Sequence, residues 1–227
     1  QTGSMKKAIS EVGKILNIKG KVVPVTFTKE SKLCVDLVDG ETIVGETHID
    51  EVELKKKRAE IKKVYLKPTA VLNVDAKEAI KHADYIVIGP GDLFTSILPN
   101  ILVKGVSLAI KNSKAKKIYV MNLMTKYGQT TKFKASDHIN ALEKYLGKNI
   151  LDYILVNNKK PKKQVLSWYQ EYEEYPVEDD LDGEYKIIRK DLLKDVIIEQ
   201  NPSDARRRSI IRHDSRKLAQ EVMNLIK

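Results

Sequence analysis

The second half of the chain alternates continuous apolar runs with segments of helical periodicity. The apolar runs predict buried strands over residues 84–88, 117–121, 152–156 and 185–188. The periodic segments predict helices over residues 76–81, 93–112 and 137–146, the second interrupted near Pro99 and Gly105. Because strands that alternate with helices pair in parallel, this half predicts a parallel sheet with right-handed crossovers.

The first half carries shorter apolar stretches and predicts a β-rich unit over residues 21–66. Its strands are expected over residues 22–25, 33–38, 42–45, 51–54 and 61–66. Asp39-Gly40 is typical of a hairpin turn. One helix is predicted over residues 5–16, and a last one begins after Asp214, a suitable N-cap. We expect one α/β domain over residues 1–227, Rossmann-like, with a mostly parallel sheet, flanking helices and the β-rich insertion.

The first of the buried strands ends abruptly in Gly89-Pro90-Gly91-Asp92, and Thr95 and Ser96 follow at the start of a helix. Ligands of α/β proteins bind at the carboxyl ends of such strands. Glycines let the backbone approach a phosphate, and the first N–H groups of a helix can bind one. This segment therefore predicts a binding loop.

Two further strand ends carry polar residues, at Asn122–Thr125 and at Asn157-Asn158. In a parallel sheet these ends converge with the glycine loop on one crevice. Each alone is also typical of an ordinary turn, so the interpretation as a ligand site depends on their combination. The loop over residues 127–131 is expected to close over that crevice.

Two histidine-containing segments leave alternatives open. Arg212 precedes the last helix and is either an anion clamp or an ordinary surface charge. Ser215, in the first turn of that helix, is a hypothetical phosphorylation site. His138 follows a cap at Ser136 or Asp137, and packing is favoured for it over general-base catalysis because no nucleophile lies nearby. His48 is expected at a strand end, and the histidine spacing predicts no metal site.

The net charge of +10 adds a possible nucleic-acid partner to these interpretations. The basic clusters at residues 55–58, 159–163 and 206–208 are separated and have acidic neighbours, which favours a solvated surface instead. The aromatic residues over 168–175 are expected to pack rather than to stack on bases. The single cysteine, Cys34, fits a reducing cytosol, and no apolar run is long enough to cross a membrane. We expect a cytoplasmic protein without membrane insertion or a nucleic-acid partner.

The chain resembles the bacterial gluconeogenesis factor family, also called YvcK-like, whose members are relatives of CofD-type 2-phospho-L-lactate transferases. The segments that carry the resemblance are residues 20–24, 39–46, 83–100, 120–125, 137–138, 152–157 and 212–214. They cover nearly the whole chain, in order. The resemblance implies a Rossmann-like fold and a cytoplasmic protein that is needed for normal cell shape on gluconeogenic carbon sources. It also implies a nucleotide-sugar ligand of the UDP-N-acetylglucosamine type.

The resemblance also assigns site residues. The Gly89–Asp92 loop with Thr95 and Ser96 approaches the ligand phosphates. Asn122 and the loop Gly128–Thr130 line the crevice, and Arg212 contributes an anion contact. No resident cofactor is expected, and the oligomeric state stays open, with a homo-oligomer among the alternatives.

The sequence departs from the family pattern at two points. The family's Gly-Gly-Gly-Thr-Gly turn and Asn-Thr-x-Asp-Asp segment do not occur here, so we expect part of the nucleotide site, and any acidic metal site, to lie in an N-terminal portion outside this sequence. Gln129 stands where the family usually has an acidic residue. Two functions follow: a regulatory nucleotide-sugar-binding protein, or a transferase of the CofD type.

Overall fold

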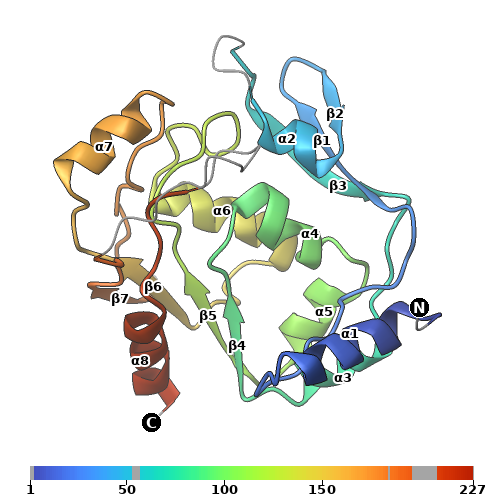
Figure 1. Ribbon diagram of the computed structural model, residues 1–227. Coiled ribbons are helices and arrows are strands. Elements are labelled where there is room, and N and C mark those ends of the chain that lie inside the picture. Colours follow the sequence, from blue (N-terminus) through green and yellow to red (C-terminus); the bar gives the residue numbers. More distant parts are fainter. Residues whose placement is uncertain (1–2, 53–56, 184, 196–208, 227) are drawn as a thin grey trace.

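The computed structural model describes residues 3–52, 57–183, 185–195 and 209–226, which form two sheets and the helices around them (Figure 1). The four-stranded sheet is parallel, in the order β4-β5-β6-β7. Its strands are β4 (Tyr85–Ile88), β5 (Lys116–Val120), β6 (Tyr153–Asn157) and β7 (Lys186–Lys190). The three-stranded sheet is antiparallel, in the order β2-β1-β3, with β1 (Lys32–Leu37), β2 (Thr42–Val44) and β3 (Ile61–Lys67). The predicted mostly parallel sheet with a β-rich insertion is therefore confirmed.

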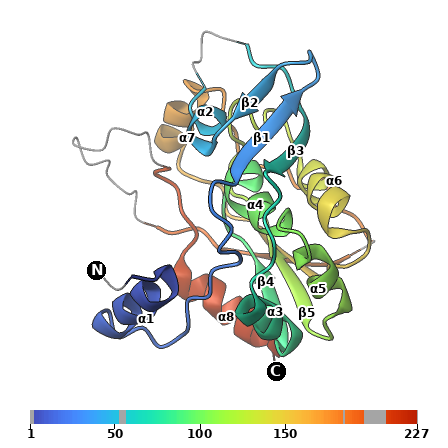
Figure 2. The ribbon, with the colours of Figure 1, turned by 90° about the vertical axis from the view of Figure 1, so that its right-hand side faces the viewer.

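Helices cover the two faces of the parallel sheet, as Figure 2 shows. The helical elements are α1 (Met5–Ile15), α2 (Glu46–Asp50), α3 (Val74–Lys81), the π-helical turn η1 (Leu93–Ile97), α4 (Leu98–Ile101), α5 (Val106–Asn112), α6 (Ala135–Leu146), α7 (Lys163–Gln170) and α8 (Ser215–Ile226). Side chains alternate between the faces of a strand. In β5, Ile118 and Val120 therefore pack towards α8, while Tyr119 joins the larger core beneath α4, α5 and α6.

The two sheets share that larger core. Leu33, Val35 and Leu37 of β1 lie in the same buried cluster as Leu98 of α4 and Tyr119 of β5. Full burial of each such side chain contributes about 1.5–3 kcal/mol. The antiparallel sheet lies beyond the end to which β4 points (Figure 1), and so α2 is placed over the carboxyl ends of the parallel strands.

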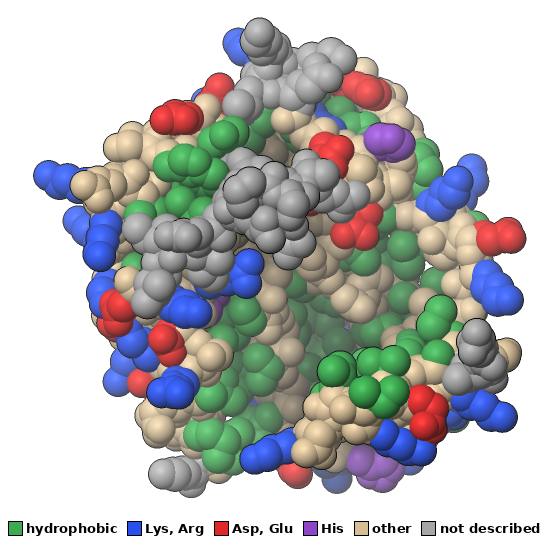
Figure 3. Space-filling model, in the orientation of Figure 1, with side chains coloured by type: hydrophobic (Ala, Val, Ile, Leu, Met, Phe, Trp, Pro, Cys, Tyr) green, Lys and Arg blue, Asp and Glu red, His purple; other side chains and the backbone are tan. Residues whose placement is uncertain are grey.

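One face of the parallel sheet is open near its edge strand. β4 pairs only with β5 among the described strands, and Val87 is 44% exposed. Figure 3 shows a hollow with apolar side chains on its floor between α8 and α1.

No described helix is long and apolar enough to cross a membrane, as expected.

Three local predictions in the first half of the chain are wrong. Residues 22–25 form no strand, because the backbone pairs with no neighbouring strand and is bonded instead to Asn73, which donates to the Pro24 and Val25 carbonyls. Residues 51–52 are not strand either, and residues 53–56 lie outside the described part of the chain. His48 belongs to α2 rather than to a strand end, and its Nδ1 lies 2.9 Å from the Val44 carbonyl oxygen.

Two helices, α7 and α6, differ from the sequence prediction. α7 was not predicted, but the aromatic cluster is a packing cluster as expected: Tyr169 is buried, and its ring centroid lies 4.9 Å from that of Trp168. The N-cap of α6 is Lys134, two residues before Ser136 and three before Asp137, so neither suggested cap is correct. Asp137 is its third residue, and its carboxylate accepts from the backbone N–H of Lys134 at 2.9 Å. His138 is fully buried, with Nδ1 2.9 Å from the Lys134 carbonyl, which agrees with packing.

Candidate functional site

A cleft of about 540 Å³ opens at the carboxyl ends of β4 and β5. The loop after β4 contributes Pro90, Gly91 and Asp92 to its lining, and residues 122–126 follow from β5. The segment over residues 209–213, just before α8, forms a further wall. Two of the three predicted strand ends therefore meet in one cleft, together with Arg212.

The glycine loop comes close to its neighbours at both glycines. Gly89 has a φ of +85°, and a Cβ there would lie 3.2 Å from the Val120 carbonyl oxygen, so a side chain is disfavoured on two grounds. A Cβ on Gly91 would lie 3.2 Å from the Cβ of Ser96. Asn122 fixes the loop, because its side-chain amide donates to the Gly91 carbonyl at 2.8 Å. A direct hydrogen bond thus joins the two strand ends that were predicted to lie close together.

A cluster of charges lies at one side of the cleft. The ammonium of Lys126 forms ion pairs with Asp50 and, at 2.6 Å, with Asp92. The same Asp50 oxygen accepts from the side-chain amide of Gln129 at 2.9 Å and from the hydroxyl of Thr95 at 3.2 Å. The three charges come from α2, the glycine loop and the loop after β5, and Thr95 comes from η1.

The contacts within this cluster favour the charged forms of Asp50 and Lys126. Burial alone raises the pKa of Asp50, but the hydrogen bond and the charge of Lys126, with the bonds from Gln129 and Thr95, hold it below its ordinary value. Burial alone lowers the pKa of Lys126, but the charge of Asp92 and the hydrogen bonds to both carboxylates raise it. Lys126 therefore remains a cation, and its charge is already matched by two carboxylates.

Several predicted site residues support the cleft instead of lining it. Thr95 is buried behind Asp50, and Ser96 lies beside Gly91 outside the lining. The Thr130 hydroxyl accepts from the Lys126 N–H at 2.8 Å. Gly128 and Thr130 were expected to line the crevice, but they do not. The loop that contains them folds back and holds Lys126 in place.

Gly128 is required at its position for two reasons. Its φ is +72°, a left-handed conformation, and a Cβ would lie 2.6 Å from a methyl group of Val52. Its N–H donates to the Thr131 hydroxyl at 2.8 Å. The loop over residues 127–131 therefore packs against the segment after α2. The structure gives no support for the expectation that this loop closes over the crevice.

The third strand end lies apart from the cleft. The side-chain oxygen of Asn157 accepts from the backbone N–H of Lys159 at 3.3 Å and of Leu192 at 3.1 Å, and its amide donates to the Lys159 carbonyl. It borders a second hollow, of about 260 Å³, which shares Asn122 with the cleft. The prediction that Asn157 lines the same crevice is therefore wrong, since its polar atoms hold the loop after β6.

Arg212 lies on the cleft wall as an exposed side chain and forms no ion pair with any described residue. His213 lies beside it, and burial lowers the pKa of its imidazole. The Nε2 atom of His213 is buried and has no hydrogen-bond partner within the described residues. These two side chains give the cleft one cation without a described ion-pair partner and one neutral imidazole.

The start of α8 agrees with the sequence prediction. Asp214 is its cap, accepting from the backbone N–H groups of Arg216 at 2.9 Å and Lys217 at 3.0 Å. Ser215 is exposed and lies outside the cleft lining. The hypothesis that Ser215 is phosphorylated stays a prediction.

Sequence reasoning missed Asp50, Lys126 and Glu174 in the cleft. Lys126 directly follows the predicted strand-end residues, so its position carried a signal. Asp50 had none, because it reaches the cleft only through the docking of α2. Glu174 lies near α7, which was not predicted, and its carboxylate accepts from the Tyr127 N–H at 3.4 Å.

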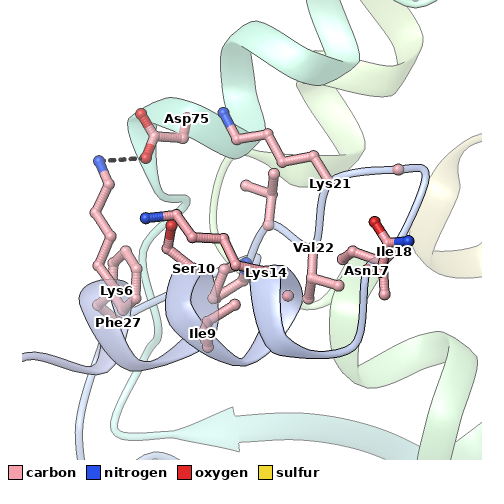
Figure 4. A pocket seen from close by; sticks show the side chains of 14 residues that line it. Lys6, Ile9, Ser10, Lys14, Asn17, Ile18, Lys21, Val22, Phe27 and Asp75 are labelled. Atoms are coloured by element: carbon pink, nitrogen blue, oxygen red, sulfur yellow. Dashed lines mark ion pairs between the residues drawn. The ribbon is translucent and has the colours of Figure 1, made fainter. Parts of the chain in front are cut away.

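A separate hollow of about 530 Å³ lies between α1, the segment after it and the start of α3 (Figure 4). Its lining combines the Lys6–Asp75 ion pair, with 2.5 Å between the charged atoms, and apolar side chains such as Ile9 and Phe27. None of the predicted site residues lines it. The candidate site is therefore the cleft at the strand ends.

The comparisons with known proteins agree with one another. Residues 1–197 match the family model described as 2-phospho-L-lactate transferase CofD. The gluconeogenesis factor of Bacillus subtilis is 34% identical over 227 residues, which is 100% of this chain and 68% of that protein. A Thermotoga maritima relative is 42% identical over 96% of this chain and 66% of its own length.

The structural comparison extends this likeness to the fold. A crystal structure of a UPF0052 family protein from Bacillus halodurans superposes with a TM-score of 0.84 at 33% identity, covering 98% of this chain and 67% of that one. The chain thus spans about two thirds of the length of these three relatives. The chain belongs to the CofD family, and within it to the group of proteins named gluconeogenesis factor.

Proposed function

We propose that the cleft binds the phosphates of a nucleotide sugar of the UDP-N-acetylglucosamine type and that the protein acts by binding, as a regulator of cell shape during gluconeogenic growth. The observation that carries the proposal is the juxtaposition of the Gly91 loop with Arg212 across one cleft of about 540 Å³. A cleft of this volume accommodates a ligand of nucleotide size.

The charges explain why Arg212 is the expected phosphate contact. Lys126 is matched by Asp50 and Asp92, whereas Arg212 has no ion-pair partner among the described residues. A guanidinium offers two parallel N–H donors to a phosphate. At Gly91 the absence of a side chain lets the ligand approach the backbone.

A transferase of the CofD type is the second candidate function. It is supported by the family match, because the model that covers residues 1–197 is described as a 2-phospho-L-lactate transferase. In this alternative the same cleft holds a nucleotide donor, and a phosphorus-containing group is transferred to a second substrate. The two functions share the binding step and differ in turnover.

Titration calorimetry with UDP-N-acetylglucosamine tests the first proposal. Wild-type protein is expected to bind with a micromolar Kd. Arg212→Ala is expected to weaken binding about 10–100-fold, since a hydrogen bond to a charged group contributes about 1.5–3 kcal/mol. Gly91→Val is expected to abolish binding. Arg216→Ala is the matched control, because Arg216 is exposed on α8 and lies outside the cleft.

Turnover assays separate the two functions. Incubation with GTP and phospholactate, followed by mass spectrometry of the products, is expected to give no product if the protein acts by binding alone. No heat with UDP-N-acetylglucosamine, together with nucleotide-dependent turnover, would overturn the first proposal and support the second.

A further inference from the structure

Arg58 is the last residue of the basic cluster over residues 55–58, which was expected to be a solvated surface. In the structure Arg58 is instead half-buried, and its guanidinium lies at the last turn of α2. Nη1 donates to the Ile49 carbonyl and Nη2 donates to the His48 carbonyl, each at 2.6 Å. Because a guanidinium is a rigid planar fork, its two bonds fix both carbonyls at once.

α2 is a short helix that depends on contacts at its carboxyl end. It spans only Glu46–Asp50, and a helix leaves its last four carbonyls without partners inside the helix. Arg58 satisfies two of them and places a positive charge at the negative end of the helix. The Ile49 side chain is fully buried in the larger core. The guanidinium and the core therefore fix α2 from two sides.

Asp50 directly follows the carbonyl that Nη1 of Arg58 binds. Its carboxylate pairs with Lys126 and accepts from the side-chain amide of Gln129 at 2.9 Å. An aspartate side chain has only two rotatable bonds, so the place of its carboxylate follows the place of its backbone. Arg58 does not line the cleft, but it holds the backbone that brings Asp50 there.

The cleft lining has more carboxylates than cations. Among the described residues, the carboxylates are those of Asp50, Asp92 and Glu174, and the cationic side chains are Lys126 and Arg212. A phosphate adds further negative charge, and like charges brought together cost affinity. A contact that keeps Asp50 in the lining therefore lowers the affinity of the cleft for an anion.

We propose that Arg58 is a positioning residue of the cleft, an inference that rests on the proposed function. By holding the end of α2, Arg58 keeps Asp50 paired with Lys126 and so limits the affinity of the cleft for phosphate. Loss of Arg58 lets Asp50 move away and leaves Lys126 freer to bind the ligand. The sign of the effect is diagnostic, because a merely structural defect weakens binding, whereas this change tightens it.

Titration calorimetry with UDP-N-acetylglucosamine measures that sign. Arg58→Ala is expected to tighten binding about 2–5-fold, as for the loss of one partly exposed charge. Asp50→Asn is expected to tighten binding to a similar extent, and Arg58→Ala is expected to add nothing in the Asp50→Asn protein. Arg189→Ala is the matched control, because the Arg189 guanidinium also donates to a backbone carbonyl, that of Leu181 at 2.8 Å, but lies outside the cleft lining.

A measurement without ligand separates this inference from the proposed function. The coupling between Lys126 and Asp50 is measured by urea unfolding of a double-mutant cycle, once with Arg58 present and once in the Arg58→Ala protein. It is expected to fall by at least half when Arg58 is lost. Circular dichroism checks folding, and Arg58→Lys, which keeps the charge but not the planar fork, replaces Arg58→Ala in both assays if Arg58→Ala does not fold.

The outcomes distinguish the two claims. An unchanged coupling, or binding that is unchanged or weaker in the Arg58 variant, would overturn the positioning role of Arg58. Absence of UDP-N-acetylglucosamine binding by the wild type and by every variant would overturn the proposed function. In that case a coupling that still falls with Arg58 would support its hold on Asp50 independently of the ligand.

Discussion

Lys126 is predicted to be a main stabilising charge of the cleft, and Lys126→Met with Asp50→Asn tests this in a double-mutant cycle. Lys126→Met leaves Asp50 and Asp92 without their shared cation. Asp50→Asn keeps the size of the side chain and removes one charge. The cycle isolates the coupling between Lys126 and Asp50 from the other contacts of each residue.

The expected magnitude follows from the exposure of the three side chains, which is 24% for Lys126, 29% for Asp50 and 41% for Asp92. Breaking a buried ion pair costs about 3–5 kcal/mol, whereas exposed pairs contribute about 0.2–1 kcal/mol. A cluster with this partial exposure lies between these limits, so Lys126→Met is expected to lower the free energy of unfolding by about 2 kcal/mol. In a chain of this size that corresponds to a fall in Tm of roughly 4–8 °C.

The same cluster predicts a pH window. The pKa of Asp50 is lower in the folded protein than in the unfolded chain. Its contribution to the free energy of unfolding is therefore present at pH values above its ordinary pKa and is lost as the pH falls through the folded pKa. The pKa of Lys126 is higher in the folded protein than in the unfolded chain. Its contribution to the free energy of unfolding is therefore present at pH values below its ordinary pKa and is lost as the pH rises through the folded pKa. The Tm difference between wild type and Lys126→Met is therefore expected to be constant from about pH 5 to 9 and to shrink outside it.

Differential scanning calorimetry and urea unfolding measure these differences. Lys134→Met is the matched control, because Lys134 pairs with Glu178 at 2.9 Å while both side chains are about half exposed or more. The control is expected to change the free energy of unfolding by less than about 1 kcal/mol. A Tm for Lys126→Met within about 1 °C of the control, or a coupling with Asp50 near zero, would refute the reasoning.

Gly128→Ala is expected to lower the free energy of unfolding by about 1–3 kcal/mol in urea, because its φ is +72° and a Cβ would lie 2.6 Å from Val52. Gly40 has a φ of +94°, but no atom lies within 4 Å of the position that a Cβ would take. If Gly40→Ala lowers the free energy of unfolding as much as Gly128→Ala does, the clash with Val52 is not the cause. Asp214→Ala removes the cap of α8 and is expected to cost about 1 kcal/mol by the same assay, and an unchanged midpoint would exclude that role. Burial lowers the pKa of His138, so the wild type is expected to lose stability as the pH falls below about 6.5, and His138→Leu is expected to flatten that dependence in Tm.

The parallel sheet could be predicted from sequence because its strands are continuous apolar runs. The central strands β5 and β6 and the edge strand β4 each lie within a residue or so of the expected bounds. Residues 22–25 have the same composition but no partner strand, so local propensity gave the wrong answer there. The difference is tertiary, since Asn73 takes the carbonyl groups that a neighbouring strand would use.

The candidate site divides in the same way. Gly91, Asp92 and Asn122 were predictable because they follow parallel strands, and the position of a strand end fixes where they lie. Asp50 was not, because its pairing with Lys126 spans 76 residues of sequence and depends on how α2 docks. Asn157 was misplaced because its side chain is used by its own loop, which strand-end reasoning does not detect.

The antiparallel unit thereby sets the charge of a cleft that belongs to the parallel sheet. Through Asp50, α2 holds Lys126 next to Asp92. We expect this arrangement to stabilise the fold and, in the proposed function, to keep that cation from the incoming phosphate. Without Asp50, Lys126 would have a single carboxylate partner and would be freer to turn to a ligand. Stability and anion affinity are therefore opposed at this lysine. In the proposed function, Arg212, which has no ion-pair partner among the described residues, binds the phosphate without that loss.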